Sequence, residues 1–171
     1  KFKKAWITMV MKNPPGWKRF ERKISKWFDR RSVLVVLTVA SLIAIFLIYE
    51  SRYVWFYGDD WAFIIGRREL WKTGSFFEFF FMPHNEHLST VPVILYSSLV
   101  SIFGVDSSIH FMVLLVALHI SAASAIYALL HRLGVSWGWS LLGFAWFALL
   151  GSGAENLLWA FQIGFVGSVS F

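Results

Sequence analysis

Two adjacent carboxylates, Asp59 and Asp60, are the residues of this sequence best suited to chemistry. They lie in the run Tyr57-Gly58-Asp59-Asp60-Trp61, less than a dozen residues after a long apolar segment. Carboxylates at a membrane surface are costly unless they are hydrated, paired or bound to a cation. Two adjacent carboxylates can together bind a divalent metal such as Mg²⁺ or Mn²⁺. Alternatively, one carboxylate can act as a general base while the other orients it. A turn or a helix N-cap without chemistry is the alternative, because Gly-Asp is common in turns.

A second polar cluster has the sequence Pro83-His84-Asn85-Glu86-His87. Two imidazoles and a carboxylate are ligands that zinc or manganese accepts. The spacing differs from the H-E-x-x-H and H-x-x-E-H motifs, in which a helical turn separates the histidines. We therefore expect His84, Glu86 and His87 to contact a substrate or a lipid headgroup rather than a metal, with a solvated loop as the alternative.

Three basic residues, Arg67, Arg68 and Lys72, follow the carboxylates by one to three helical turns. On a helix that lies along a membrane surface, they are placed to bind an anionic lipid phosphate. A salt bridge to Glu69, or anchoring at lipid headgroups, explains them equally well.

Ionisable residues also occur within or between the apolar runs. Glu155, followed by Asn156, lies between two of these runs. Such a residue is a candidate for function, although a snorkelling side chain or a helix cap is also found at a membrane boundary. His110 and His119 fit hydrogen bonding across packed helices better than a proton relay.

The elements that must position these residues are predicted to be membrane helices. The chain is 57% hydrophobic and only 15% charged, against about one quarter charged in soluble domains. A helix needs about 20 apolar residues, and at least about 17, to cross the hydrocarbon core. We predict an all-α polytopic membrane protein, a transmembrane helix bundle, with spans at residues 32–49, 107–130, 135–153 and 156–171.

The residues between the first two spans predict a large outer loop with interfacial helices. Charged residues alternate with aromatic residues through 50–87, as is typical of the membrane–water interface. We expect short helices at about 60–73 and 75–82. Residues 88–105 are apolar but rich in serine, and they either cross the membrane or lie on its outer face.

The topology depends on that last segment. If 88–105 crosses, Arg132 lies outside and Glu155 lies in the cytoplasm. If it stays on the outer face, Arg132 is cytoplasmic and Glu155 is on the same side as Asp59 and Asp60. The tendency of cytoplasmic loops to be basic favours the second arrangement.

Charge at the N-terminus sets the orientation. Residues 1–32 contain eleven Lys or Arg and two acidic residues. We interpret 1–31 as a basic amphipathic segment on the cytoplasmic face, with a solvated basic tail as the alternative. Because this block adjoins an apolar span, anionic membrane lipids rather than nucleic acid are the expected partners. The chain has no cysteine, which excludes disulfides and thiolate sites.

These features resemble the polyprenyl-phosphate-dependent glycosyltransferases of the GT-C fold. The resemblance covers about 32–171 and depends on Asp59-Asp60, the outer loop, the segment Val91-Pro92 that leads into an apolar helix, and the two spans before Glu155. It implies a bacterial plasma-membrane enzyme with an extracytoplasmic active site. The chain begins at Lys1 and ends within an apolar run, so we expect the N-terminal part of a longer protein that is inactive alone.

The resemblance also implies roles for individual residues. A first-loop carboxylate acts as base or metal ligand, and Asp60 is favoured over Asp59. Glu155 resembles the second acidic residue of the family, and Arg67 or Arg68 is expected at the phosphate of the donor. The sequence has Asp-Asp where many relatives have Asp-Glu, and it lacks the basic-Pro-Pro signature before the next apolar helix.

Two other classes of protein remain open. In a transporter or channel subunit, Glu155, His110 and His119 would line a pathway. In a non-catalytic membrane scaffold, the basic tail would bind anionic lipid or a cytoplasmic partner, and replacing Asp59 and Asp60 would change nothing.

Overall fold

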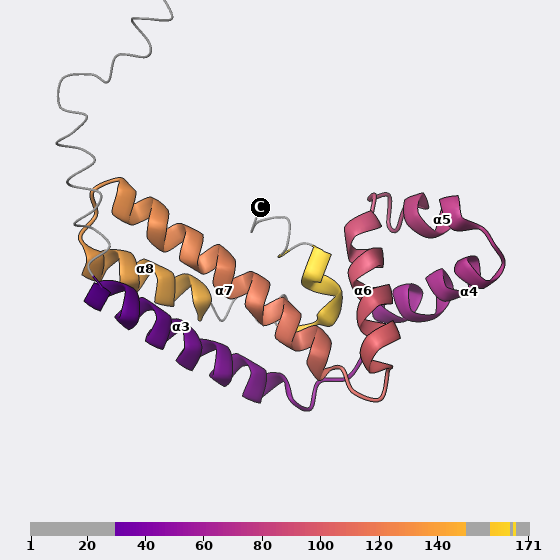
Figure 1. The fold of residues 1–171 in the computed structure, drawn as a ribbon, viewed down its shortest axis with the longest axis horizontal. Coiled ribbons are helices and arrows are strands. Elements are labelled where there is room, and N and C mark those ends of the chain that lie inside the picture. Colours follow the sequence, from indigo (N-terminus) through magenta and orange to yellow (C-terminus); the bar gives the residue numbers. More distant parts are fainter. Residues whose placement is uncertain (1–29, 150–157, 165, 167–171) are drawn as a thin grey trace, which may run out of the picture.

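The computed structural model describes residues 30–149, 158–164 and 166 of the 171-residue chain (Figure 1). Within this part the chain is mostly helical and forms no strand. Glu155 and nearly all of the basic segment 1–31 lie outside the described residues. In chain order the helical elements are α3 (Arg30–Ser51), η1 (Ala62–Gly66), α4 (Arg67–Lys72), α5 (Phe76–Phe81), α6 (Thr90–Phe103), α7 (Ile109–Arg132), α8 (Trp137–Ala148) and η3 (Ala160–Gln162).

Helices α3 and α7 are long and apolar enough to cross a membrane. The candidate spans are Arg31–Ser51, with a mean hydropathy of 2.7, and Ile109–Arg132, with a mean hydropathy of 2.2. They agree with the predicted spans 32–49 and 107–130. Much of the surface of α3 is apolar and exposed, which is compatible with contact to membrane lipid.

Helices α3, α7 and α8 pack along one another on one side of the molecule (Figure 1). Their shared core consists of apolar side chains that include Ile43 and Leu47 of α3, Val116 and Ala123 of α7, and Phe144 of α8. Small residues allow helix backbones to approach closely in apolar surroundings. At Gly143 of α8 the approach is so close that an added Cβ would lie 2.7 Å from Cδ1 of Leu130 in α7.

The N-terminal half of α7 packs instead on the loop and on α6. Phe111, Met112 and Leu115 belong to a second core with residues of η1, α5, α6 and the 158–164 segment. Ser108, just before α7, donates a hydrogen bond to the carbonyl of Val54, and Phe111 meets Phe56 edge to face at 4.9 Å. Helix α7 therefore connects the helical bundle with the part of the chain that carries the carboxylates.

Short helices occur where the aromatic and charged loop predicts them. Helices η1 and α4 fall within the predicted 60–73, and α5 falls within 75–82. Helix α6 has 14 residues, which corresponds to a rise of about 21 Å. This is less than the hydrocarbon thickness of about 30 Å, so the length of α6 favours the arrangement in which 88–105 stays on one face.

Helix α8 has 12 residues and occupies the middle of the predicted span 135–153; residues 150–157 lie outside the described part. Near its last turn, Nε2 of His119 in α7 lies 3.2 Å from the carbonyl oxygen of Ala148. The carbonyls of a final helical turn have no partner within their own helix. The prediction that His119 hydrogen-bonds across helices is thus confirmed. His110 stacks on Phe103 with ring centroids 3.9 Å apart.

We predict that Gly143→Leu destabilises the packing of α7 against α8. The added side chain must displace Leu130, and overpacking of this kind costs about 1–3 kcal/mol. The measurement is the free energy of unfolding of the purified protein in mixed micelles. Gly138→Leu is the matched control, because Gly138 lies on the same helix with no atom within 4 Å of its would-be Cβ. Equal losses for the two variants would contradict the close approach at Gly143.

Candidate functional site

A tight turn positions the two aspartates. Gly58 has φ +56°, a conformation that glycine adopts without strain. The amides of Asp60 and Trp61 point back to the carbonyls of Tyr57 and Gly58, at 3.3 and 3.4 Å, and helical structure begins at Asp60. Adjacent side chains at such a helix start point in different directions, so the two carboxylates enter different surroundings.

Asp60 is completely buried, with 0% of its surface exposed. One carboxylate oxygen accepts a hydrogen bond from the hydroxyl of Tyr96 in α6, and the other accepts from the backbone N–H of Tyr57 at 3.1 Å. Burial raises the pKa of Asp60, although these bonds, the Trp159 side chain and the Phe161 backbone oppose the rise. Burial and the neighbouring charge raise the pKa of Tyr96 as well, which keeps its hydroxyl protonated as a donor.

Asp59 is the accessible carboxylate of the pair. Its side chain is 38% exposed, and its Oδ2 lies 3.6 Å from Nε2 of His84. The Nδ2 of Asn85 donates to the same oxygen at 3.3 Å. Nε2 of His84 is itself buried and has no hydrogen-bond partner among the described residues. An unsatisfied buried nitrogen costs about 1–3 kcal/mol, so its presence in a folded protein calls for a specific reason.

A two-residue turn brings the 83–87 cluster to Asp59. His84 and His87 exchange two backbone hydrogen bonds of 2.9 Å, while Asn85 and Glu86 between them have φ values of +47° and +66°. Positive φ at both central residues is the geometry of a type I′ turn, which favours asparagine. The turn directs Asn85 toward Asp59, whereas the side chains of Glu86 and His87 are exposed.

The ring of His84 is fixed by aromatic neighbours. It packs against Phe63 of η1 and Phe161 of η3, with centroid distances of 5.1 and 5.4 Å. Trp159 stacks on Tyr57 at 5.1 Å and its indole donates to the Tyr57 carbonyl at 3.3 Å. Residues about 100 positions after the aspartates therefore complete their surroundings.

The predicted basic residues have different roles in the structure. Arg67 is buried and donates to the carbonyls of Glu78 at 2.8 Å, Phe79 at 3.2 Å and Met82. Its guanidinium thus satisfies carbonyls at the end of α5, and burial lowers its pKa. Lys72 is exposed and pairs with Glu69 at 2.7 Å, which is the alternative to phosphate binding that the sequence left open.

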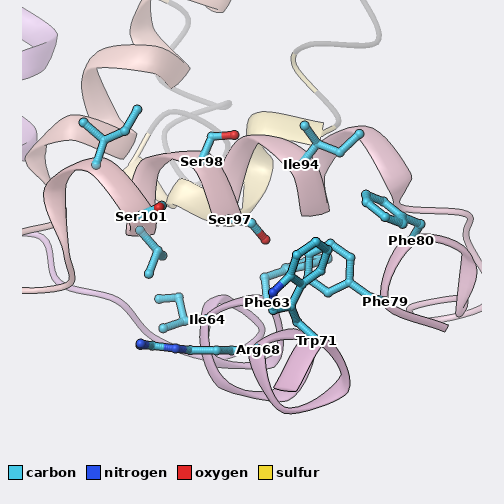
Figure 2. A pocket seen from close by; sticks show the side chains of 12 residues that line it. Phe63, Ile64, Arg68, Trp71, Phe79, Phe80, Ile94, Ser97, Ser98 and Ser101 are labelled. Atoms are coloured by element: carbon cyan, nitrogen blue, oxygen red, sulfur yellow. The ribbon is translucent and has the colours of Figure 1, made fainter. Parts of the chain in front are cut away.

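Arg68 lies elsewhere, at an open cavity of about 760 Å³ between η1–α4 and α6. The walls of this cavity are mostly apolar, and three serines of α6 contribute to them (Figure 2). Phe63 lines the cavity and also contacts His84, so this ring separates the cavity from the surroundings of Asp59.

The geometry does not suit a metal ion bridged by both aspartates. The oxygens of Asp60 face protein donors in a fully buried setting, whereas the Asp59 side chain is directed at His84 and Asn85. Among the described residues, no three His, Asp or Glu side chains gather as metal ligands. The group in this arrangement that can accept a proton from a substrate is the Asp59 carboxylate. Its neighbours on two sides are Asn85 and His84.

Comparison with protein-family models, with curated proteins and with solved structures finds no match for this chain.

Sequence reasoning missed three residues of this site: Tyr96, Trp159 and Asn85 as a direct partner of Asp59. Tyr96 carried a usable signal, because a buried tyrosine normally needs a partner for its hydroxyl and Tyr96 lies in an uncharged helix. Trp159 gave no such signal, since tryptophan is common throughout this chain.

We predict that Tyr96→Phe lowers the free energy of unfolding by about 1–3 kcal/mol, because it removes a donor from a buried carboxylate. Chemical denaturation in micelles measures this. Tyr53→Phe is the control, as Tyr53 is 83% exposed. A Tyr96→Phe protein as stable as the control would show that Asp60 does not depend on this bond.

We further predict that Arg67→Gln destabilises the protein by about 1–3 kcal/mol or more, since buried carbonyls lose their donor. Arg68→Gln removes the same charge from the neighbouring position and is expected to leave the melting temperature nearly unchanged. If both variants melt alike, Arg67 is not the cap of α5.

Proposed function

We propose that this chain is the N-terminal part of a membrane glycosyltransferase of the GT-C type. The enzyme would move a sugar from a polyprenyl-phosphate donor to an extracytoplasmic acceptor. The observation that supports this best is the accessible Asp59 carboxylate, held by Asn85 and beside His84, at one end of an apolar helical assembly.

Asp59 is the general base in this proposal. The acceptor hydroxyl gives its proton to a carboxylate oxygen of Asp59 while the acceptor oxygen attacks the anomeric carbon of the sugar. The bond from that carbon to the phosphate oxygen breaks, and polyprenyl phosphate leaves with the electron pair. A carboxylate suits this step because its oxygen can accept the proton of a hydroxyl that lies within hydrogen-bond distance.

The choice of Asp59 differs from the sequence-based preference for Asp60. An acceptor hydroxyl must reach the base within hydrogen-bond distance, and Asp60 is closed off from such an approach by burial. Asp60 instead fixes the turn that precedes η1 through Tyr57 and Tyr96. In this proposal, Asp60 positions the turn and Asp59 accepts the proton.

Aromatic packing gives His84 a supporting role. Its ring is held between Phe63 and Phe161, and its Nε2 faces Asp59 without a hydrogen bond. Because this nitrogen is itself buried, His84 is proposed to limit the orientations of the Asp59 carboxylate rather than to contact the substrate.

The membrane arrangement belongs to the same proposal. Helices α3 and α7 would cross the bilayer of a bacterial plasma membrane, with the basic N-terminus in the cytoplasm and η1, α4 and α5 at the outer interface. Exposed aromatic side chains on α4 and α5, among them Trp71, Phe76 and Phe77, suit the headgroup region. Glu155 remains the predicted second acidic residue on that side.

The test is transfer of labelled sugar from polyprenyl-phosphate donors by membranes that contain the full-length protein. Asp59→Asn keeps the shape of the side chain but removes the base, so transfer is expected to fall by about 10²–10⁴-fold. Asp106→Asn is the control, since Asp106 is exposed in the loop before α7. Transfer by Asp59→Asn at the level of this control, with normal folding, would refute the assignment.

A further inference from the structure

The cavity beside α6 has the chemistry of a lipid site. Its volume of about 760 Å³ falls within the range of about 300–1,000 Å³ that is typical of small-molecule pockets. Figure 2 shows aromatic rings of η1, α4 and α5, among them Phe63, Trp71 and Phe79, facing α6 across this space. Aromatic walls of this kind suit a hydrocarbon chain.

Arg68 adds a positive charge to the cavity. It is exposed and makes no hydrogen bond or ion pair with any residue in the described part of the chain. Its neighbours differ in this respect, because Arg67 caps α5 and Lys72 pairs with Glu69. A guanidinium with free donors binds phosphate in a forked geometry.

Hydroxyl groups lie on the opposite wall. Ser97, Ser98 and Ser101 of α6 line the cavity, and Ser97 points from α6 toward the aromatic rings (Figure 2). The rim contains apolar side chains that are exposed, including Ile94 and Ile102. The cavity is thus open at an apolar edge, through which an acyl chain can enter from a bilayer.

We infer that this cavity binds one acyl chain of an anionic phospholipid from the surrounding bilayer, with the lipid phosphate at Arg68. The inference does not depend on glycosyl transfer. Phe63 contributes to the wall of the cavity and packs on His84, which in turn faces Asp59. This aromatic ring lies between the cavity and the surroundings of Asp59, which favours a separate bilayer lipid over the donor.

The experiment uses the purified full chain in nanodiscs that contain equal amounts of phosphatidylglycerol and phosphatidylcholine. Native mass spectrometry then counts the lipids that remain bound after release. We expect about one retained phosphatidylglycerol per chain, and about a tenfold weaker retention in Arg68→Gln, because a charge-assisted phosphate contact is lost. Lys72→Gln is the matched control, with the same loss of charge on α4, and is expected to retain the lipid.

A second variant tests the chain rather than the charge. Ser97→Phe fills the cavity and is expected to abolish retention while Arg68 is intact; thermal melting of each variant verifies that it folds. Equal retention of phosphatidylcholine, or unchanged retention in Arg68→Gln, would overturn the inference. Displacement of phosphatidylglycerol by an equal amount of polyprenyl phosphate would also overturn it, since the cavity would then be the donor site.

Discussion

The arrangement of this protein depends on the burial of one carboxylate. A carboxylate that loses contact with water needs donors on its oxygens, because an unpaired buried charge is strongly destabilising. Asp60 obtains them from Tyr96 of α6 and from the backbone of Tyr57, with Trp159 and Phe161 close by. Three segments that are distant in sequence are thereby held at one point.

The fixed position of Asp60 determines where its neighbour must lie. Asp59 precedes Asp60 at the start of a helical run. The side chain of Asp59 is therefore turned toward the 83–87 turn and toward solvent. The turn reaches the same place because α5 ends on Arg67, and α7 ties this region to the apolar bundle through Phe111 and Ser108. Packed elements thus surround a partly exposed carboxylate, which is the setting that the proposed base requires.

Apolar length and residue spacing were sufficient to predict several elements. The uncharged runs that became α3 and α7 are long enough to specify helices without tertiary information, and the aromatic and charged residues near 60–82 indicated short helices. Asp59, His84 and Asn85 were all in motifs visible in the sequence. Their contact across 26 positions was not visible, because it depends on the turn at Asn85-Glu86.

The sequence could not predict which residue of each adjacent pair, Asp59 and Asp60 or Arg67 and Arg68, has a structural role. Asp59 and Asp60 are chemically identical, and the partner that distinguishes them, Tyr96, lies 36 positions away. Arg67 and Arg68 are likewise equivalent until the carbonyls of α5 approach one of them. Adjacent residues on a helix face different surroundings, so long-range packing decides which one is structural and which one is available.

Carboxylate footprinting tests this division most directly. A water-soluble carbodiimide with an amine nucleophile modifies exposed carboxylates of the folded protein, and tandem mass spectrometry locates the modified residue. We predict modification of Asp59, with exposed Asp106 as the reference, and protection of Asp60 until the protein is unfolded. Modification of Asp60 at the rate of Asp59 in the folded protein would contradict the buried carboxylate on which the whole arrangement depends.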